Sequence, residues 1–362
     1  MQRDKGFSLI EVMVSTAILV IIMAATLGAL TDALHANEAV TLMADMEDNL
    51  RACMNMMVRD IIQAGSGIPI GGISIPFTNP AANPLGLPIP LPINRPSPPT
   101  DAYTFPVAAN LTAVNPGFDL GPTSLGNLTD MITLIYTDNE LPWSTMAPIN
   151  NVAGPACGGT IAANGSTITF NTATLGCSQL AAGNVSVQPG DLLMLTNTQG
   201  GNIIQQVTNV AGSVVSFAPG DAFGLNGALA ASGTIAQLQT APGVFPPTSA
   251  TRIWMVTYFL NTTINPQRPT LMRQINFNAP AAVGQVMEGL QITYDVVNAV
   301  ATVPANNARN IIAPDSPNQI RKINLYLAAR SENPYSVTKQ YFRANLLTQV
   351  GLRSLAFQNI YN

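Results

Sequence analysis

Histidine is almost missing from this chain of 362 residues. The single histidine, His35, follows an apolar stretch near the N-terminus, and residues 36–362 contain none. This scarcity removes Ser-His-Asp and Cys-His catalysis, and every histidine-based metal site, from the main body of the protein. Phosphate loops, paired catalytic carboxylates and Cys-x-x-Cys pairs are also missing from the sequence. We therefore expect neither an enzyme nor a bound cofactor.

Charge is scarce too. Only 9% of the residues are charged, against 47% hydrophobic ones, and the net charge is −4. This balance excludes a disordered chain and a general nucleic-acid binder. Residues 66–250 hold 1 basic and 7 acidic residues, so their surface must be made polar by Asn, Thr, Ser and Gln. Such a surface suits an extracytoplasmic protein.

A long apolar run opens the chain. Residues Phe7 to Leu30 contain one ionisable side chain, Glu11. At a rise of ~1.5 Å per residue this run makes ~36 Å of helix, enough to cross a hydrocarbon core of ~30 Å. Arg3 and Lys5 precede it, which keeps the N-terminus cytoplasmic and sends the rest across the membrane. The run is too long for an ordinary secretory signal, and an acid at this depth is usually functional.

The N-terminal sequence Lys5-Gly6-Phe7-Ser8-Leu9-Ile10-Glu11-Val12-Met13-Val14 resembles the class III leader junction of type IV prepilins and type II secretion pseudopilins. The resemblance implies a leader of residues 1–6. It also implies that a prepilin peptidase cuts between Gly6 and Phe7 and then N-methylates Phe7. In a bundle of apolar helices, the Glu11 carboxylate can pair with the amino group of a neighbouring subunit's Phe7. Such a pair sets register more than it adds stability.

The helical pattern continues beyond the membrane half, which we assign to residues 7–30. A stripe at spacings of three and four follows in residues 31–64: Met43, Met46, Leu50, Cys53, Met57 and Ile61. Gly65 and Gly67 are a stop signal. The pattern predicts one helix from Phe7 to Ala64.

Two further features resemble one group of pilins, the PilW/PulJ-like minor pilins. The run from Met57 to Gly65 contains the Arg-Asp-Ile-x-x-Ala-Gly phrase with which that group tends to end its helix. Later segments resemble its successive strands, namely residues 130–137, 190–196, 290–295 and 323–331.

The rest of the chain, residues 65–362, is predicted to be a β-rich head. Ten prolines between Pro69 and Pro99 exclude helix and central strand from the Pro-rich segment 66–100 and favour an extended surface connection. Short runs rich in Val, Ile, Thr and Tyr then predict strands at 130–136, 166–171, 191–196, 203–210, 213–217, 252–260, 270–277, 290–297, 321–331 and 338–348. The predicted fold class is α+β, a long helical stalk packed on an enlarged, mainly antiparallel β pilin-like head, with an inserted lobe at residues 139–247.

Three cysteines remain. Cys157 and Cys177 lie 20 residues apart in a segment placed outside the cytoplasm, and we expect them to form a disulfide. Cys53 lies in the helix stripe and is expected to be a buried free thiol. Residues 138–140 and 219–221 carry acids that could bind calcium, but neither has the spacing of a known calcium loop, so turns are favoured and no metal site is predicted.

The predicted function is that of a minor pilin, a low-copy subunit that primes or caps a type IV pilus. Its expected partners are the prepilin peptidase, other minor and major pilins through the N-terminal helix, and the inner membrane before assembly; its final place is the extracellular pilus tip. Three alternatives remain. They are a type II secretion pseudopilin, a tip adhesin or DNA receptor suggested by the net charge of +6 from Arg252 to Arg353, and a membrane-anchored hydrolase that no residue supports.

Overall fold

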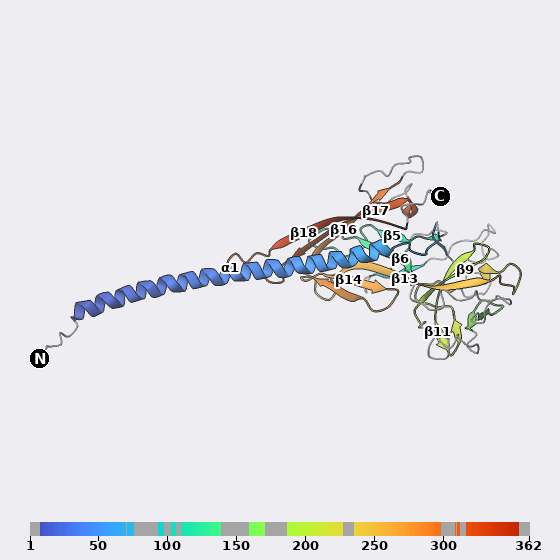
Figure 1. Ribbon diagram of the computed structural model, residues 1–362, viewed down its shortest axis with the longest axis horizontal. Coiled ribbons are helices and arrows are strands. Elements are labelled where there is room, and N and C mark those ends of the chain that lie inside the picture. Colours follow the sequence, from blue (N-terminus) through green and yellow to red (C-terminus); the bar gives the residue numbers. More distant parts are fainter. Residues whose placement is uncertain are drawn as a thin grey trace.

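One long helix emerges from a β-rich head (Figure 1). The computed structural model describes residues 8–69, 71–75, 93–97, 103–105, 110–138, 159–170, 187–226, 235–297, 308, 310–311 and 316–354. Helix α1 spans Leu9–Gln63, 55 residues, or about 83 Å at the usual rise. The prediction of a single helix from Phe7 to Ala64 is confirmed to within one residue at its C-terminal end. Phe7 lies outside the described residues.

Helix α1 stops where the glycines predicted. Gly65 and Gly67 have φ of 80° and 69°, a region that glycine enters without strain. At Gly67 a Cβ would also lie 2.3 Å from Oγ1 of Thr137. The amide of Gly65 donates to the carbonyl of Ile135 at 2.8 Å. The chain therefore leaves the helix directly onto the edge of a strand.

The buried face of α1 largely follows the predicted stripe. The helix residues buried in the head are Met46, Leu50, Cys53, Met54, Met57, Asp60 and Ile61. Met43, predicted to belong to the stripe, is 39% exposed, and Leu42 is partly buried instead. A step of four residues back from Met46, rather than three, keeps the stripe on the same face at this end of the helix.

In the part of the chain that the structure describes, eighteen strands form five sheets, and every strand pair is antiparallel. The seven-stranded sheet comprises β5 (Val114–Gly117), β6 (Met131–Thr137), β9 (Leu192–Asn197), β10 (Asn202–Gln206), β13 (Thr248–Asn261), β14 (Thr270–Ile275) and β15 (Ala281–Gln285). The three-stranded sheet comprises β16 (Met287–Val296), β17 (Ile320–Arg330) and β18 (Arg343–Gly351). The four-stranded sheet comprises β7 (Gly159–Ile161), β8 (Thr167–Phe170), β11 (Asn209–Ala211) and β12 (Val214–Ser216). Two short pairs complete the set, β1 (Ile73–Ser74) with β4 (Asn110–Leu111), and β2 (Asn94–Arg95) with β3 (Tyr103–Thr104). The α+β, mainly antiparallel fold is confirmed.

The outer half of α1 lies between the three-stranded sheet and the seven-stranded sheet (Figure 1). Their apolar faces and the helix stripe share one core, which includes Leu50, Met57, Leu134, Val256 and Leu325. At the close approach of β15, a Cβ on Gly284 would lie 2.0 Å from Sγ of Cys53. Only glycine allows the strand to come this near to the helix.

A second core lies farther from the N-terminus. The four-stranded sheet packs there against β9, β10 and the start of β13, with a 3₁₀ helix η4 (Ile235–Leu238) beside it. We call this body, residues 159–170, 187–226 and 235–250, the distal lobe. Strand β13 belongs to both bodies, because it pairs with β9 over Thr248–Ile253 and with β6 over Ile253–Tyr258.

Three sequence expectations need correction. The Pro-rich segment 66–100 is not only a surface connection, because its described parts contain β1 and β2 and bury Ile73, Ile93 and Arg95. The predicted strand 203–210 breaks after Gln206 into β10 and β11. The predicted strand 338–348 begins only at Arg343, because the residues before it form a loop that reaches α1. A composition that favours strands acts locally, and a strand forms only where a neighbouring strand is present to pair with it.

Candidate functional site

The first half of α1 is an exposed apolar rod. Its large apolar side chains from Leu9 to Leu34 are at least half exposed, and the first partly buried residue is His35. By length and composition, α1 is the one helix in the described part of the chain that could cross a membrane. A soluble head would bury such a surface, so this half must be covered by lipid or by other helices.

Glu11 lies in the first turn of this rod. Its Oε2 accepts a hydrogen bond from the amide of Ser8 at 2.9 Å, the contact of a capping box at the helix start. The carboxylate is thus turned back toward Ser8, at the start of the helix. Gly6 and Phe7 lie outside the described residues.

Asp60 forms a second polar site, buried where α1 meets the head. It accepts hydrogen bonds from the Tyr258 hydroxyl at 2.6 Å and the Tyr136 hydroxyl at 3.4 Å. Arg273 on β14 adds Nε at 2.7 Å and Nη2 at 3.2 Å from the two carboxylate oxygens. One carboxylate therefore ties α1 to β6, β13 and β14.

The electrostatics of this cluster keep the two phenols and the guanidinium in fixed protonation states. Burial, followed by the charge of Asp60, raises the pKa of Tyr136 to about 12 and raises that of Tyr258 further. Burial alone would lower the pKa of Arg273, but its hydrogen bonds to Asp60 and the charge of that carboxylate outweigh burial and raise it. Both phenols stay protonated donors and the guanidinium stays charged at neutral pH.

Sequence reasoning missed the Asp60 cluster. Asp60 follows the stripe residue Met57 by three positions and Cys53 by seven, so it falls on the face predicted to be buried. An acid on a buried helix face needs partners, and that was the available signal. The partners themselves are 76 to 213 residues away along the chain, so no local pattern could name them.

The remaining candidate residues are placed as follows. Cys53 is buried and free, and burial raises the pKa of its thiol to about 11. Cys157 and Cys177 lie outside the described residues, so their disulfide stays a prediction. Asp138 pairs with Arg252, and Asp221 accepts from the amides of a turn, as expected. Within the residues that the structure describes, no three His, Cys, Asp or Glu side chains gather to hold a metal ion.

Comparison with known proteins identifies a motif at the N-terminus of the chain. Residues 1–27 match the model of the prokaryotic N-terminal methylation motif. No curated protein sequence and no solved structure matches the chain. The match covers the leader and the first part of α1, and the head has no counterpart in it. Together with the exposed apolar helix, this prepilin-type motif supports a pilin-type or pseudopilin-type structural subunit, anchored in the membrane before assembly.

The motif also implies two partners of a general kind. A prepilin-type signal is processed by a prepilin peptidase, and the processed chain assembles with other pilin-type subunits.

Proposed function

We propose that this chain is a PilW/PulJ-like minor pilin, a low-copy subunit that primes or caps a type IV pilus at its tip. One observation carries the proposal. The distal lobe lies at the end of the molecule opposite to the exposed half of α1 (Figure 1). It thus extends the head along the direction in which the helix points.

This position matters because subunits of such a filament share a core made of their N-terminal helices. Each internal subunit then has neighbours displaced along the fibre in both directions. A body that projects past the C-terminal end of α1 occupies the space in which the next head would stack. At the fibre end that space is open, so the lobe supports an end position and a low copy number.

The end position predicts a labelling pattern. Gold-labelled antibody against residues 139–247 should mark single filament ends, whereas antibody against the major pilin should mark the shaft. Deleting the gene should reduce or abolish piliation if the subunit primes assembly. Label spaced regularly along whole filaments would contradict the tip placement. Intact pili with failed export of secreted enzymes would instead favour the type II secretion pseudopilin.

Processing gives a second prediction. We propose cleavage between Gly6 and Phe7, followed by N-methylation of Phe7. Replacing Gly6 with valine should leave an uncut precursor in the membrane, because a branched side chain replaces the glycine at the scissile bond. Mass spectrometry of the N-terminal peptide decides between methylated Phe7 and Met1. An N-terminus near Ala36 would show signal-peptidase cleavage and overturn the pilin interpretation.

The DNA-receptor alternative receives less support from the charges. Six basic residues between Arg252 and Arg353 form ion pairs with acids, namely Arg252, Arg268, Arg273, Lys322, Arg330 and Arg343. Arg321 donates to backbone carbonyls. The net charge of +6 in this tract therefore overstates the number of basic side chains that could bind a phosphate backbone, because most of them already have partners.

A further inference from the structure

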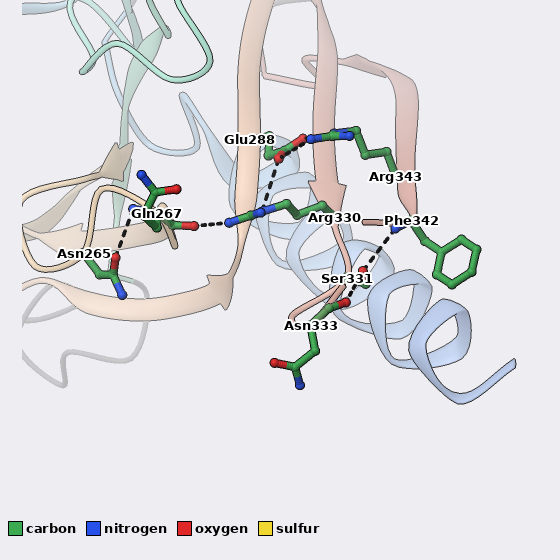
Figure 2. Close-up of polar contacts among 8 residues, drawn as sticks. All are labelled: Asn265, Gln267, Glu288, Arg330, Ser331, Asn333, Phe342 and Arg343. Carbon is green, nitrogen blue, oxygen red and sulfur yellow. Dashed lines mark hydrogen bonds and ion pairs between the residues drawn. The ribbon is translucent and has the colours of Figure 1, made fainter. Parts of the chain in front are cut away.

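Two loops form the end of the head that faces the exposed half of α1 (Figure 1). The first, residues 262–269, joins β13 to β14, and the second, residues 331–342, joins β17 to β18. Figure 2 shows them side by side, with Arg330, the last residue of β17, reaching toward the first loop. Its Nη2 donates to the carbonyl of Gln267, and its Nε lies 3.2 Å from Oε1 of Glu288. A further ion pair joins Arg268 to Glu332 at 2.7 Å. The two loops are thus one connected surface.

Each loop is also fixed internally. In the first, the amide of Gln267 donates to Oδ1 of Asn265 at 3.0 Å. In the second, Oγ of Ser331 donates to the carbonyl of Asn333 at 2.8 Å and accepts from the amide of Phe342 at 3.1 Å (Figure 2). These side chains bond to backbone amides and carbonyls that have no strand partner in a loop. Both loop tips therefore hold defined positions.

The second loop is bound to α1. Ser336 donates its amide to Oε1 of Glu38 at 3.2 Å and its hydroxyl to the other oxygen of that carboxylate. Nδ1 of His35 lies 3.1 Å from the same hydroxyl. The ring of Tyr335 meets the His35 ring edge to face, with centroids 6.4 Å apart. The only histidine of the chain therefore belongs to the first contact between the helix and the head.

The position of this contact along α1 sets its depth. The uncharged run ends near Leu30, and His35 follows five residues later, or about 8 Å along the helix axis. The polar headgroup layer adds about 5–8 Å to each side of the hydrocarbon core. With α1 across the bilayer, the loop bound at His35 lies at the level of the headgroups.

The side chains at the tips of the two loops are of kinds that favour the lipid headgroup region. Ile264 is 83% exposed and Val337 is 56% exposed, one on each loop. Tyr335 and Tyr341 are partly buried on the second loop, and tyrosine is enriched at the boundary between lipid and water. Arg268 and Glu332 neutralise each other. Lys339 forms no ion pair with the described residues, and a flexible lysine can extend toward lipid phosphates.

We propose that loops 262–269 and 331–342 form an interfacial anchor, a surface that rests on the phospholipid headgroups of the bilayer that α1 spans. The inference rests on the membrane stage of the proposed function. It adds that the head is held in one orientation on the lipid before assembly, through Ile264, Val337 and the two tyrosines. Extraction of the subunit into a fibre must then release this contact as well as α1.

Tryptophan reporters in the full-length protein test the anchor. The protein is placed in phosphatidylcholine vesicles with brominated acyl chains, which quench fluorescence at short range. Four variants are compared with the parent, whose Trp143 and Trp254 give the background. They are I264W and V337W at the loops, L19W inside the apolar rod, and L347W on β18. Leu347 is the matched control, since it is 71% exposed but lies in the strand that leads away from the loops.

The anchor predicts that L19W is quenched most and that I264W and V337W are quenched about twofold or more above L347W, because residues at the interface sit close to the brominated chains. Quenching of L19W with I264W and V337W no higher than L347W would overturn the anchor and leave the membrane-spanning helix intact. If the two loop reporters shift only when another pilin is added, the surface is a subunit interface and the anchor is wrong. If L19W also escapes quenching, α1 does not span the bilayer, and both inferences fail.

Discussion

Replacing Asp60 with alanine is expected to lower the free energy of unfolding of the head by about 3–5 kcal/mol, the usual cost of removing one partner of a buried ion pair. The variant leaves Arg273 charged without its carboxylate and the Tyr258 hydroxyl without its 2.6 Å acceptor. The Asp60 side chain is only 7% exposed, so water cannot replace these contacts. The same change would free the end of α1 from three strands at once.

Urea unfolding of the full-length protein in detergent, followed by the combined fluorescence of Trp143 and Trp254, measures this loss. Glu47→Ala is the matched control, because Glu47 is an acid on the same helix that pairs with an arginine, Arg51, at 3.0 Å in an exposed position. That control should cost at most about 0.5 kcal/mol. A loss below about 1 kcal/mol for Asp60→Ala would show that the cluster is not a buried ion pair in solution.

Glu11→Leu should abolish incorporation into filaments while leaving the protein processed and stable in the membrane. The head begins to contact α1 only at His35, so a change at Glu11 cannot reach its core. Within a bundle of apolar helices, the carboxylate has no water to solvate it and gains most by pairing with the amino group of a neighbouring Phe7. Leucine would remove that proposed pair and with it the preferred stagger of the helices.

Immunoblots of sheared filaments and of the membrane fraction separate assembly from stability. Ser15→Leu is the matched control, because it adds the same apolar side chain one turn farther along and keeps the carboxylate. The Ser15 hydroxyl only donates to the carbonyl of Val12 in its own helix. Incorporation of the Glu11→Leu protein at the level of Ser15→Leu would remove the register role, and loss of both from the membrane would point to misfolding instead.

Much of this fold could be read from local patterns. The apolar run and the stripe from Met46 to Ile61 defined α1, since the run is too long for a strand and the stripe repeats every three to four residues. The stretches 130–136 and 321–331 correspond to β6 and β17, the long strands that cross the apolar core. Both stretches are rich in residues that favour strands, so they can be predicted without any knowledge of their neighbours.

The features that escaped prediction depend on distant partners. β1 and β2 have two residues each, too few for a period, and exist because β4 and β3 pair with them. Residues 338–342 were predicted to begin a strand, yet they belong to a loop whose Ser336 bonds to Glu38, 298 positions earlier. The Glu11 and Gly6 assignments came from a motif rather than from packing, and their roles stay predictions.

Strand β13 has a mechanical consequence for the proposed position at a fibre end. Its first residues pair with β9 in the distal lobe, and its last six pair with β14 in the sheet that packs on α1. A pull on the lobe that is resisted by α1 is therefore carried along this strand. Antiparallel hydrogen bonds lie perpendicular to the strand, so the load shears many of them together instead of opening them one at a time. The resistance of a protein to a pulling force depends on its unfolding rate. Because many hydrogen bonds must break together, we expect the force to be transmitted to α1 before the lobe unfolds.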